Sequence, residues 1–368
     1  MRSKIFVALL WLSDVHRTIT TPVLASSSLL LESFDLSVMG SSSFIQNMIM
    51  ETKSICGANL YNNQTGDKIP HNLWIAVKDN PSSYLEWPNI KNEIEINPSW
   101  SVHICDNIAK DSFMETFFPN TSLLKSYRNI NPVIAGAAKA DIWRYAMLFV
   151  FGGVYIDSDS QLRTSLNEVI NPADEMILAF ENNHFDGDWC YSPNSEFATR
   201  NVIRKNPQVE KMGIFKGRIL TNWCIMSAPG HIFLSSALET FVKLSRAEFL
   251  RLSNLKISLW DPFSKYVYCS TGPSMFTASA RKVMIENSFT NGSFTRNKVS
   301  RDKSREIVHG RSTYRLASKD FGHEGGVFKA VRNTKADKDH YSQIVPSKVR
   351  QLLHHRNPFC ICKLQKLP

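Results

Sequence analysis

The sequence predicts an α/β fold, and three observations carry this prediction. The chain has 368 residues and is 43% hydrophobic, which supports a sizeable core in one large domain or two small ones. Short apolar runs typical of buried strands alternate with segments that favour helix. One such segment, residues 135–151, leads through Gly152 and Gly153 into an apolar strand that ends in two aspartates. Because α/β proteins bind ligands at the carboxyl ends of strands, we expect a functional site at this strand end.

Four elements are expected before this segment. Short apolar runs bounded by proline or polar residues indicate buried strands, and prolines inside helical stretches are expected to break them. The expected elements are a strand within residues 69–77, a helix over 82–94 broken at Pro88, a turn and strand over 97–107, and a helix over 107–128 interrupted at Pro119.

The central segment is expected to be a helix, a glycine turn and a strand. Pro132 suits the first helical turn, with Asn131 as its N-cap, and good helix formers or large apolar residues continue to Phe151. Gly152 and Gly153 then stop the helix, because glycine adopts left-handed backbone conformations at low cost. The next three residues, 154–156, are strong strand formers.

The strand ends in an Asp-x-Asp pair that favours a metal site. Alternate residues of a strand share a face, so Tyr155, Asp157 and Asp159 are expected to point the same way. Two such carboxylates repel each other unless a cation lies between them, and hard oxygen ligands suit Mg²⁺ or Mn²⁺. On the preceding helix, Asp141 and Arg144 are three residues apart and share a face. The alternative is a pair of solvated loop carboxylates, because this triplet is common by chance.

After the aspartates, the pattern predicts a continuing α/β succession. Asn222 and Trp223 could face the site, although a tryptophan on a strand can equally pack in the core. Residues 181–217 form a long irregular polar stretch, which is typical of a functional segment. The other expected elements are a short helix over 161–170, a strand over 176–180 and an amphipathic helix over 232–252.

The central segment resembles the sugar-binding region of a known enzyme family. The pattern A-x-x-D-x-x-R-Y-x-x-L-x-x-x-G-G-x-Y-x-D-x-D is similar to that of retaining GT-A glycosyltransferases, specifically glycosyltransferase family 32. This family includes fungal Golgi α-1,6-mannosyltransferases and sphingolipid mannosyltransferases. The matching residues are Ala138, Asp141, Arg144, Tyr145, Leu148, Gly152, Gly153, Tyr155, Asp157 and Asp159.

The resemblance implies a GT-A fold, with a Rossmann-like nucleotide-binding half and a mixed central sheet flanked by helices. It also implies that Asp157 and Asp159 bind a divalent cation, Mn²⁺ or Mg²⁺, with Asp159 as the direct ligand. Asp141 and Arg144 would position a nucleotide-sugar donor, and Tyr155 would pack on its ribose or sugar. All four charged residues are therefore candidate catalytic residues.

Further segments resemble the same family. The segment 221–234 is similar to a family strand, Pro-Gly turn and helix start, and residues 271–273 are similar to a family turn that leads into a helix. The stretch 181–217 is expected on the acceptor side. His71-Asn72-Leu73-Trp74 is similar to its opening H-Q-x-W, with asparagine in place of glutamine, and implies that Trp74 lies near the donor base; a plain core tryptophan is the alternative. The segment 323–329 is similar to a histidine followed by G-S-W, here replaced by Gly-Val-Phe. This implies that His323 lies near the metal and the pyrophosphate.

The resemblance implies transfer of a hexose, most simply mannose from GDP-mannose, to a glycan or glycolipid acceptor. A UDP-hexose donor stays open, as does a catalytically inactive carbohydrate-binding relative. A metal-dependent phosphoesterase is a third alternative, but it would need further clusters of aspartate and histidine, which the sequence does not show. Nucleic-acid binding is not expected despite a net charge of +10, because no basic helix or aromatic-basic RNA motif occurs.

The chain is expected to divide into three parts. Residues 1–65 have the character of a signal or anchor and stem, residues 66–345 that of the GT-A catalytic domain, and residues 346–368 that of a basic tail. The apolar run 5–12 is too short to span a bilayer but long enough for a signal peptide, so membrane association through the N-terminus stays open. The resemblance implies the Golgi or another secretory-pathway lumen. Seven scattered cysteines without a paired C-x-x-C pattern make structural zinc unexpected.

Overall fold

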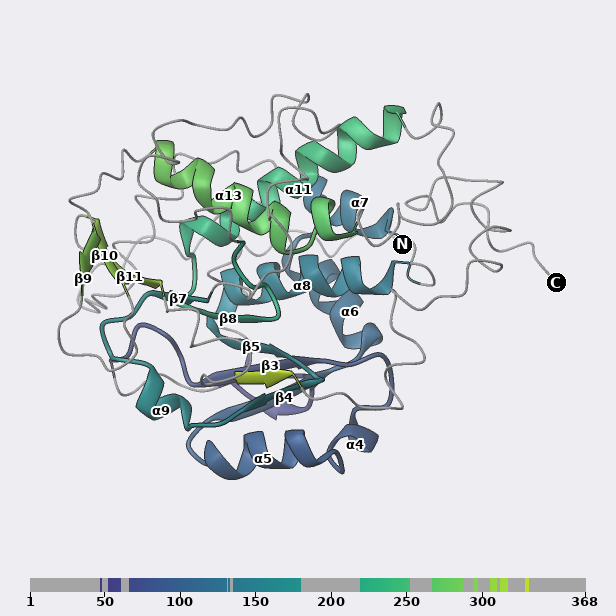
Figure 1. Cartoon of the computed structure of the whole chain (residues 1–368). Coiled ribbons are helices and arrows are strands. Elements are labelled where there is room, and N and C mark those ends of the chain that lie inside the picture. Colours follow the sequence, from purple (N-terminus) through teal and green to yellow (C-terminus); the bar gives the residue numbers. More distant parts are fainter. Residues whose placement is uncertain are drawn as a thin grey trace, which may run out of the picture.

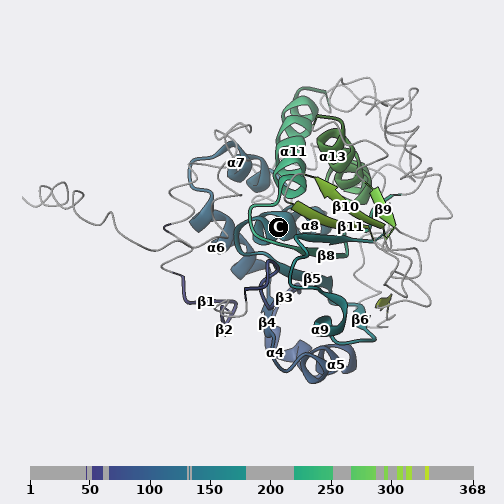
Figure 2. The same cartoon turned by 90° about the vertical axis from the view of Figure 1, so that its left-hand side faces the viewer.

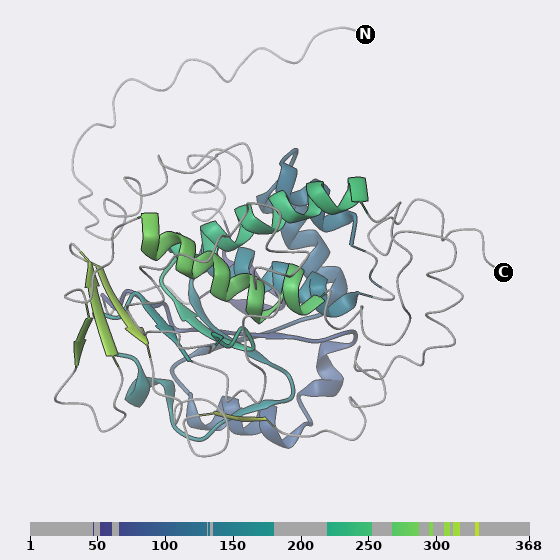
Figure 3. The ribbon, with the colours of Figure 1, turned by 45° about the horizontal axis from the view of Figure 1, so that its top comes forward.

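A mixed β-sheet lies between two groups of helices in the computed structural model of the chain (Figure 1). Helices α6 and α8 cover one face of the sheet, with α7, α11 and α13 stacked behind them, and α4, α5 and α9 lie on the opposite side. Figure 3 shows α11 and α13, in green, lying side by side across the bluer helices. The helices are α4 (Pro81–Tyr84), α5 (Pro88–Ile96), α6 (Asn107–Phe117), α7 (Ser122–Arg128), α8 (Gly136–Phe151), α9 (Leu166–Val169), α11 (Ile232–Arg251) and α13 (Pro273–Glu286).

The structure describes most of the chain between residues 52 and 286 and four short strands beyond it. The described residues are 47, 52–60, 66–130, 132, 135–179, 219–251, 267–286, 294–296, 305–309, 312–316 and 328–330.

The central sheet has eight strands in the order β4-β3-β5-β8-β7-β11-β10-β9. β3 runs parallel to both β4 and β5, whereas β8 runs antiparallel to β5 and β7. β11 is parallel to β7, and β10 is antiparallel to β11 and β9. The strands are β3 (Asn72–Ala76), β4 (Ser101–Cys105), β5 (Gly153–Asp157), β7 (Met176–Leu178), β8 (Cys224–Ser227), β9 (Phe294–Arg296), β10 (Arg305–His309) and β11 (Ser312–Leu316).

Strands β3, β5, β7 and β8 are buried on both faces, so this part of the sheet separates two cores. Trp74 of β3 is in register with Tyr155 of β5, which is in register with Ile225 of β8. All three face the core formed with α6, α7, α8, α11 and α13. The alternate residues face a second core with α5 and α9, because successive side chains of a strand point to opposite faces. These residues are Leu73, Ile75, Val154, Ile156, Cys224 and Met226.

Helix α8 is the innermost helix, and 13 of its 16 residues are buried. A helix that is apolar on all sides is a buried one, and here the sheet covers one side while α6 and α11 cover others. It begins at Gly136, after Ala135, rather than at Pro132 with an Asn131 cap; Pro132 lies in a turn before it. The expected N-terminal cap was therefore wrong, while the expected end at Phe151 is confirmed.

Gly152 and Gly153 make the turn from α8 into β5, and both have left-handed φ angles, 64° and 100°. A Cβ on Gly153 would lie 2.3 Å from the carbonyl oxygen of Asn72, and one on Gly152 would lie 2.7 Å from Cδ of Pro229. The turn therefore requires glycine both for its backbone conformation and for close packing against β3 and the β8–α11 turn.

Most of the expected elements are confirmed, including the helix that restarts at Pro88 and the break at Pro119. The helix expected over residues 161–170 was wrong in its first half. Ser160–Leu162 form strand β6, which pairs antiparallel with β12 (Phe328–Ala330), and only Leu166–Val169 are helical. The reason is the hydrogen-bond partner that β12 offers, since a pattern in a short segment does not reveal a strand supplied from far along the chain.

A small hairpin, β1 (Ser54–Ile55) and β2 (Ala58–Asn59), is attached to the outer strand β4 (Figure 2). Cys56 at its tip forms a disulfide with Cys105 at the end of β4. The carbonyl of Ile55 also lies 2.9 Å from Nδ1 of His103. The last part of the expected stem is thus fixed to the sheet, while the boundary near residue 65 stays a prediction. Across the described helices, no segment is long and apolar enough to cross a bilayer.

Candidate active site

The carboxyl ends of β3, β4 and β5 meet at one edge of the sheet. Ala76 of β3 is in register with Cys105 of β4 on one side and with Asp157 of β5 on the other. Asp157 is therefore the residue that β5 delivers to this edge, and its side chain is 33% exposed. The position agrees with the site expected from the sequence.

Asp157 is held by two neighbours that approach the same carboxylate oxygen. The hydroxyl of Tyr155 donates to Oδ1 of Asp157 over 2.6 Å, and Nη2 of Arg144 lies 3.1 Å from that oxygen. Tyr155 and Asp157 share a strand face, as alternation predicts. Within the described residues, both contacts fall on Oδ1, so Oδ2 remains for a further ligand.

Arg144 joins the helix α8 to the strand end. Its Nη2 lies 3.1 Å from Oδ1 of Asp141, and its Nη1 donates to the carbonyl of Asn222 over 2.6 Å. Its guanidinium carbon lies 4.3 Å from the centroid of the Tyr155 ring. Asp141 and Arg144 are one helical turn apart and share a face, as expected from their spacing.

Asp141 accepts hydrogen bonds from two further segments. Asn222, just before β8, donates from Nδ2 to Oδ1 over 3.0 Å, and Thr271, just before α13, donates from Oγ1 to Oδ2 over 2.9 Å. The same Nδ2 lies 3.1 Å from the hydroxyl of Tyr145, which donates to the carbonyl of Thr271. Three segments distant in sequence thus converge on one buried carboxylate.

Burial and charge shift the protonation equilibria of this network in opposite directions. Burial raises the pKa of Asp141 to about 6, although Arg144 and the hydrogen bond from Thr271 act to lower it. Burial alone would lower the pKa of Arg144, but the negative charges of Asp157 and Asp141 outweigh burial, so the pKa of Arg144 is raised. Arg144 therefore stays cationic and provides a permanent positive charge beside Asp141 and Asp157.

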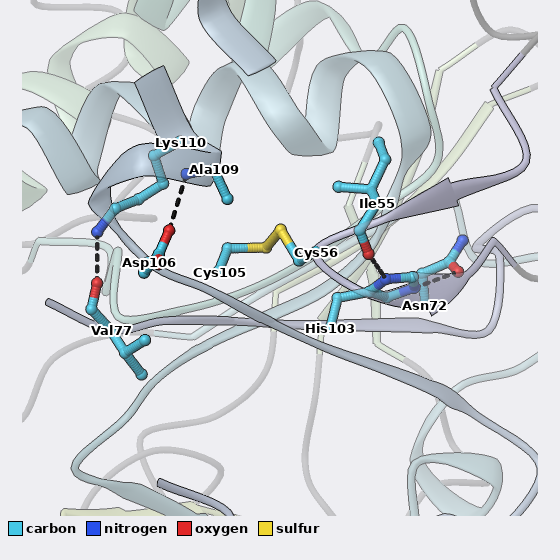
Figure 4. Close-up of a disulfide and its surroundings, with 9 residues drawn as sticks. All are labelled: Ile55, Cys56, Asn72, Val77, His103, Cys105, Asp106, Ala109 and Lys110. Carbon is cyan, nitrogen blue, oxygen red and sulfur yellow. Dashed lines mark hydrogen bonds between the residues drawn. A yellow bond between two sulfur atoms is a disulfide. The ribbon is translucent and has the colours of Figure 1, made fainter. Parts of the chain in front are cut away.

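A second cation lies at the same edge. Lys110, in the first turn of α6, donates from Nζ to the carbonyl of Val77 over 2.9 Å (Figure 4). Its helix is capped by Asp106, whose Oδ1 accepts from the amide of Ala109. Burial, followed by the charge of Arg144, lowers the pKa of Lys110 to about 8. The edge therefore carries two buried cations beside one half-exposed carboxylate.

The second aspartate lies in a turn rather than on the strand. β5 ends at Asp157, Ser158 and Asp159 form a turn, and β6 begins at Ser160. The face shared by Tyr155 and Asp157 therefore cannot be extended to Asp159 by strand alternation. Asn89 of α5 donates from Nδ2 to the carbonyls of Ser158 and Ser160, over 2.7 and 2.9 Å.

Comparison with known proteins agrees with this geometry. Residues 86–176 match a glycosyltransferase sugar-binding region containing a DXD motif. This region includes Asp141, Arg144, Asp157 and Asp159, and it supports a glycosyltransferase in general. The mixed central sheet flanked by helices confirms the predicted α/β class and is consistent with a GT-A fold. No curated protein matches the chain.

Among solved structures, one described as PaToxG Glycosyltransferase is similar at 14% sequence identity. The similarity covers 71% of this chain and 81% of that chain, with a TM-score of 0.33.

The two aspartates of the matched segment fit a divalent cation of the Mg²⁺ or Mn²⁺ type. Oδ2 of Asp157 and the carboxylate of the half-exposed Asp159 are hard oxygen donors two residues apart, which is the chemistry that these ions prefer. No group of three or more metal-binding side chains occurs in the described part of the chain. Such an ion is commonly bound through one or two carboxylates, with substrate phosphates and water completing its shell, so two aspartates suffice.

Two predicted donor contacts occupy different places from those expected. Trp74 is fully buried, its Nε1 donates to the carbonyl of Gly152 over 2.8 Å, and its ring stacks on His103. This is the core-tryptophan alternative, so direct contact with a donor base is not supported. Tyr155 is 1% exposed and supports Arg144 and Asp157, so packing on a ribose or sugar is not supported either.

The remaining predicted residues have mixed outcomes. Asn222 faces the site, as expected, whereas Trp223 packs partly buried against the second core. His323 lies outside the described residues, as does the stretch 181–217 expected on the acceptor side. Sequence reasoning missed the hydroxyl of Thr271 and the amide of Asn89. The polar residues Asn89, Asn92 and Glu93 on one face of a helix were a signal that could have indicated buried polar contacts.

Proposed function

We propose that this chain is a metal-dependent, retaining glycosyltransferase that transfers a hexose, mannose from GDP-mannose, to a glycan or glycolipid acceptor. The observation that carries the proposal is the convergence of Arg144, Asp141 and Asp157 at the carboxyl edge of the sheet, inside a sugar-binding region. The donor sugar, the acceptor and the retention of configuration rest on the family resemblance. A UDP-hexose is the alternative donor.

In this proposal, each residue of the network has a defined task. Asp157 and Asp159 would hold Mn²⁺ or Mg²⁺, and this ion would supply Lewis-acid stabilisation to the diphosphate leaving group. Arg144 adds a fixed positive charge near the phosphate oxygens. Because its three contacts are already formed within the protein, it needs little reorganisation when the donor binds.

In the same proposal, Asp141 accepts hydrogen bonds from sugar hydroxyls. Its oxygens are already contacted by Asn222, Thr271 and Arg144, and a carboxylate has about four lone-pair sites. A sugar hydroxyl could therefore add to these bonds without displacing them. Tyr155 positions Arg144 through its ring and Asp157 through its hydroxyl. His323 stays a candidate for completing the metal or pyrophosphate site.

We also propose that the chain works in the Golgi or another secretory-pathway lumen. The disulfide between Cys56 and Cys105 supports this, and Cys269 is also disulfide-bonded. Persistent disulfides are typical of oxidising compartments and rare in the cytosol. Association with the membrane through residues 1–65 belongs to the same proposal.

Donor hydrolysis by the purified full chain tests the proposal. GDP- and UDP-sugars are offered with and without Mn²⁺, and the nucleotide released is identified. The Asp159→Ala variant should lose metal-dependent release, whereas Glu168→Ala, which removes an exposed carboxylate of α9, should retain it. Release of one nucleotide in wild type alone names the donor class.

Metal-independent release, or equal release by Asp159→Ala, would contradict the metal assignment. Tight donor binding without hydrolysis or transfer to any acceptor would instead favour the carbohydrate-binding alternative.

A further inference from the structure

One face of helix α5 contacts the backbone of the segment that carries the second aspartate. Asn89, Asn92 and Glu93 occupy positions i, i+3 and i+4, which lie on the same face of a helix. Asn92 donates from Nδ2 to the carbonyl of Leu162 over 3.0 Å, and the amide of Leu162 donates to Oε1 of Glu93 over 2.7 Å. Just past the helix, Asn97 accepts from the amide of Leu166 over 2.8 Å.

Asn89 differs from the others because its bonds flank Asp159. Its Nδ2 donates both hydrogens, one to the carbonyl of Ser158 and one to that of Ser160. An amide nitrogen has two hydrogens, so both are used on this turn. Asn89 is only 4% exposed, so water competes little for these hydrogen bonds.

The opposite edge of the same segment is also held. Ser160 is in register with Ala330, and Leu162 with Phe328, through the β6–β12 ladder. The segment that begins directly after Asp159 is therefore fixed by α5 side chains and by the backbone of β12. Asp159 itself sits at the end of this fixed segment, in a turn whose two neighbouring carbonyls point at one nitrogen.

We propose that Asn89 is a positioning residue that sets the Asp159 turn for a divalent cation bound together with a nucleoside diphosphate. The inference rests on the proposed function and names a residue outside the Asp-x-Asp pair. Its physical reason is preorganisation: a turn already held in the binding conformation does not lose backbone entropy when the cation binds. Groups that orient metal ligands typically account for a 10- to 100-fold change in metal affinity.

The test uses a matched pair of variants of the full chain, Asn89→Leu and Asn92→Leu. Leucine is close to asparagine in size and cannot donate, and both changes remove hydrogen bonds from α5 to the same segment. Binding of Mn²⁺ in the presence of GDP, or of UDP, is followed by electron paramagnetic resonance of the free ion. Thermal unfolding is measured in parallel.

We expect Asn89→Leu to weaken Mn²⁺ binding at least about 10-fold and Asn92→Leu to change it less than about 2-fold, at similar unfolding temperatures. In turnover, the loss in Asn89→Leu should shrink as Mn²⁺ is raised, which a merely structural defect would not do. If Asn89→Leu does not fold, Asn89→Asp and Asn92→Asp form a second pair, because aspartate keeps the shape but turns a carboxylate toward the carbonyl oxygens.

Two outcomes would overturn the inference while the proposed function stands. Either Asn89→Leu binds Mn²⁺ like wild type, or Asn92→Leu is weakened equally. If wild type binds no Mn²⁺ with either nucleotide, the proposed function itself is wrong, and the positioning role falls with it.

Discussion

The guanidinium of Arg144 lies over the ring of Tyr155, with 4.3 Å between the guanidinium carbon and the ring centroid. Both side chains then converge on Oδ1 of Asp157. The tyrosine thus supports the arginine with its ring and the aspartate with its hydroxyl. This relationship gives a buried tyrosine a supporting role in the site.

Removal of Arg144 should destabilise the fold as well as impair donor binding. Arg144→Ala leaves Oδ1 of Asp141 and Oδ1 of Asp157 without their cation. Removal of one partner of a buried ion pair costs about 3–5 kcal/mol. Urea unfolding measures this loss. The matched control is Arg128→Ala, whose partner Glu115 is exposed and whose pair contributes no more than about 1 kcal/mol. Equal losses would show that the network is energetically unimportant.

Arg144→Lys separates charge from shape. Lysine keeps the positive charge but lacks the planar fork that contacts Asp141, Asp157 and the carbonyl of Asn222 together. We expect a higher donor KM and a lower kcat than in wild type, checked by steady-state kinetics. Unchanged values for both would count against a role in positioning the donor.

Asp159→Ala should abolish turnover but spare the fold. Metal stabilisation of a leaving diphosphate amounts to several kcal/mol, so we expect at least about a 100-fold loss of turnover. Asp159 lies in a half-exposed turn, so the unfolding temperature should change by about 2 °C or less. Differential scanning fluorimetry alongside a donor-release assay would check both parts. Substantial turnover in this variant would remove Asp159 from the site.

Glu93 should make stability depend on pH. Burial raises its pKa to about 8, although the amide of Leu162 and Asn92 act to lower it. Since the unfolded carboxyl titrates near 4.5, folding takes up a proton between these values. The stabilisation is complete below pH 4.5 and is lost as pH rises through about 8, in total about 5 kcal/mol.

Glu93→Gln should remove this dependence, because glutamine still accepts from Leu162 but cannot ionise. Urea unfolding should show the variant equal to wild type near pH 4.5 and clearly more stable at pH 9. A constant difference between the two proteins at every pH would mean that Glu93 does not titrate in this range.

Gly153→Ala should be strongly destabilising. Its Cβ would lie 2.3 Å from the carbonyl oxygen of Asn72, and its φ of 100° is strained for any residue with a side chain. We expect a loss of about 3 kcal/mol or more in urea unfolding. Gly136→Ala is the matched control, because nothing lies within 4 Å of its Cβ; it should be neutral or stabilise by about 0.5 kcal/mol. Similar effects at both positions would contradict the packing argument.

Loss of the disulfide between Cys56 and Cys105 should cost about 4 kcal/mol, from closure of a loop with a sequence separation of 49 residues. The double variant Cys56→Ala/Cys105→Ala, compared with wild type by urea unfolding, measures this. Cys224→Ala removes a buried free thiol and controls for lost sulfur volume; it should cost about 1 kcal/mol. A double variant no less stable than this control would show that the bridge does not contribute.

The sequence predicted the elements whose signals are local. Gly152 and Gly153 announce a turn because few other residues tolerate it, and the spacing of Asp141 and Arg144 places them on one helical face. Contacts between distant segments left no such signal. Nothing near Thr271 indicates that its hydroxyl bonds Asp141, 130 residues away, and nothing near Gln161 indicates that β12 will pair with it.

Tryptophan and tyrosine were hardest to assign, since both serve in cores and in binding sites. Trp74 and Tyr155 lie in register on neighbouring strands. Strand alternation places Tyr155 on the same face as Asp157, but it does not say whether that face is buried in the core or open to a ligand. The packing of α6 and α8 against that face shows that both side chains belong to the core.

The disulfide at the tip of the β1–β2 hairpin also has a mechanical consequence. Two-residue strands resist little pulling force by hydrogen bonding alone. Because Cys56 is joined covalently to Cys105, tension applied to the polypeptide ahead of the hairpin is delivered directly to the end of β4. The hairpin therefore transmits tension to the sheet through a covalent bond, and its few hydrogen bonds do not have to bear the force.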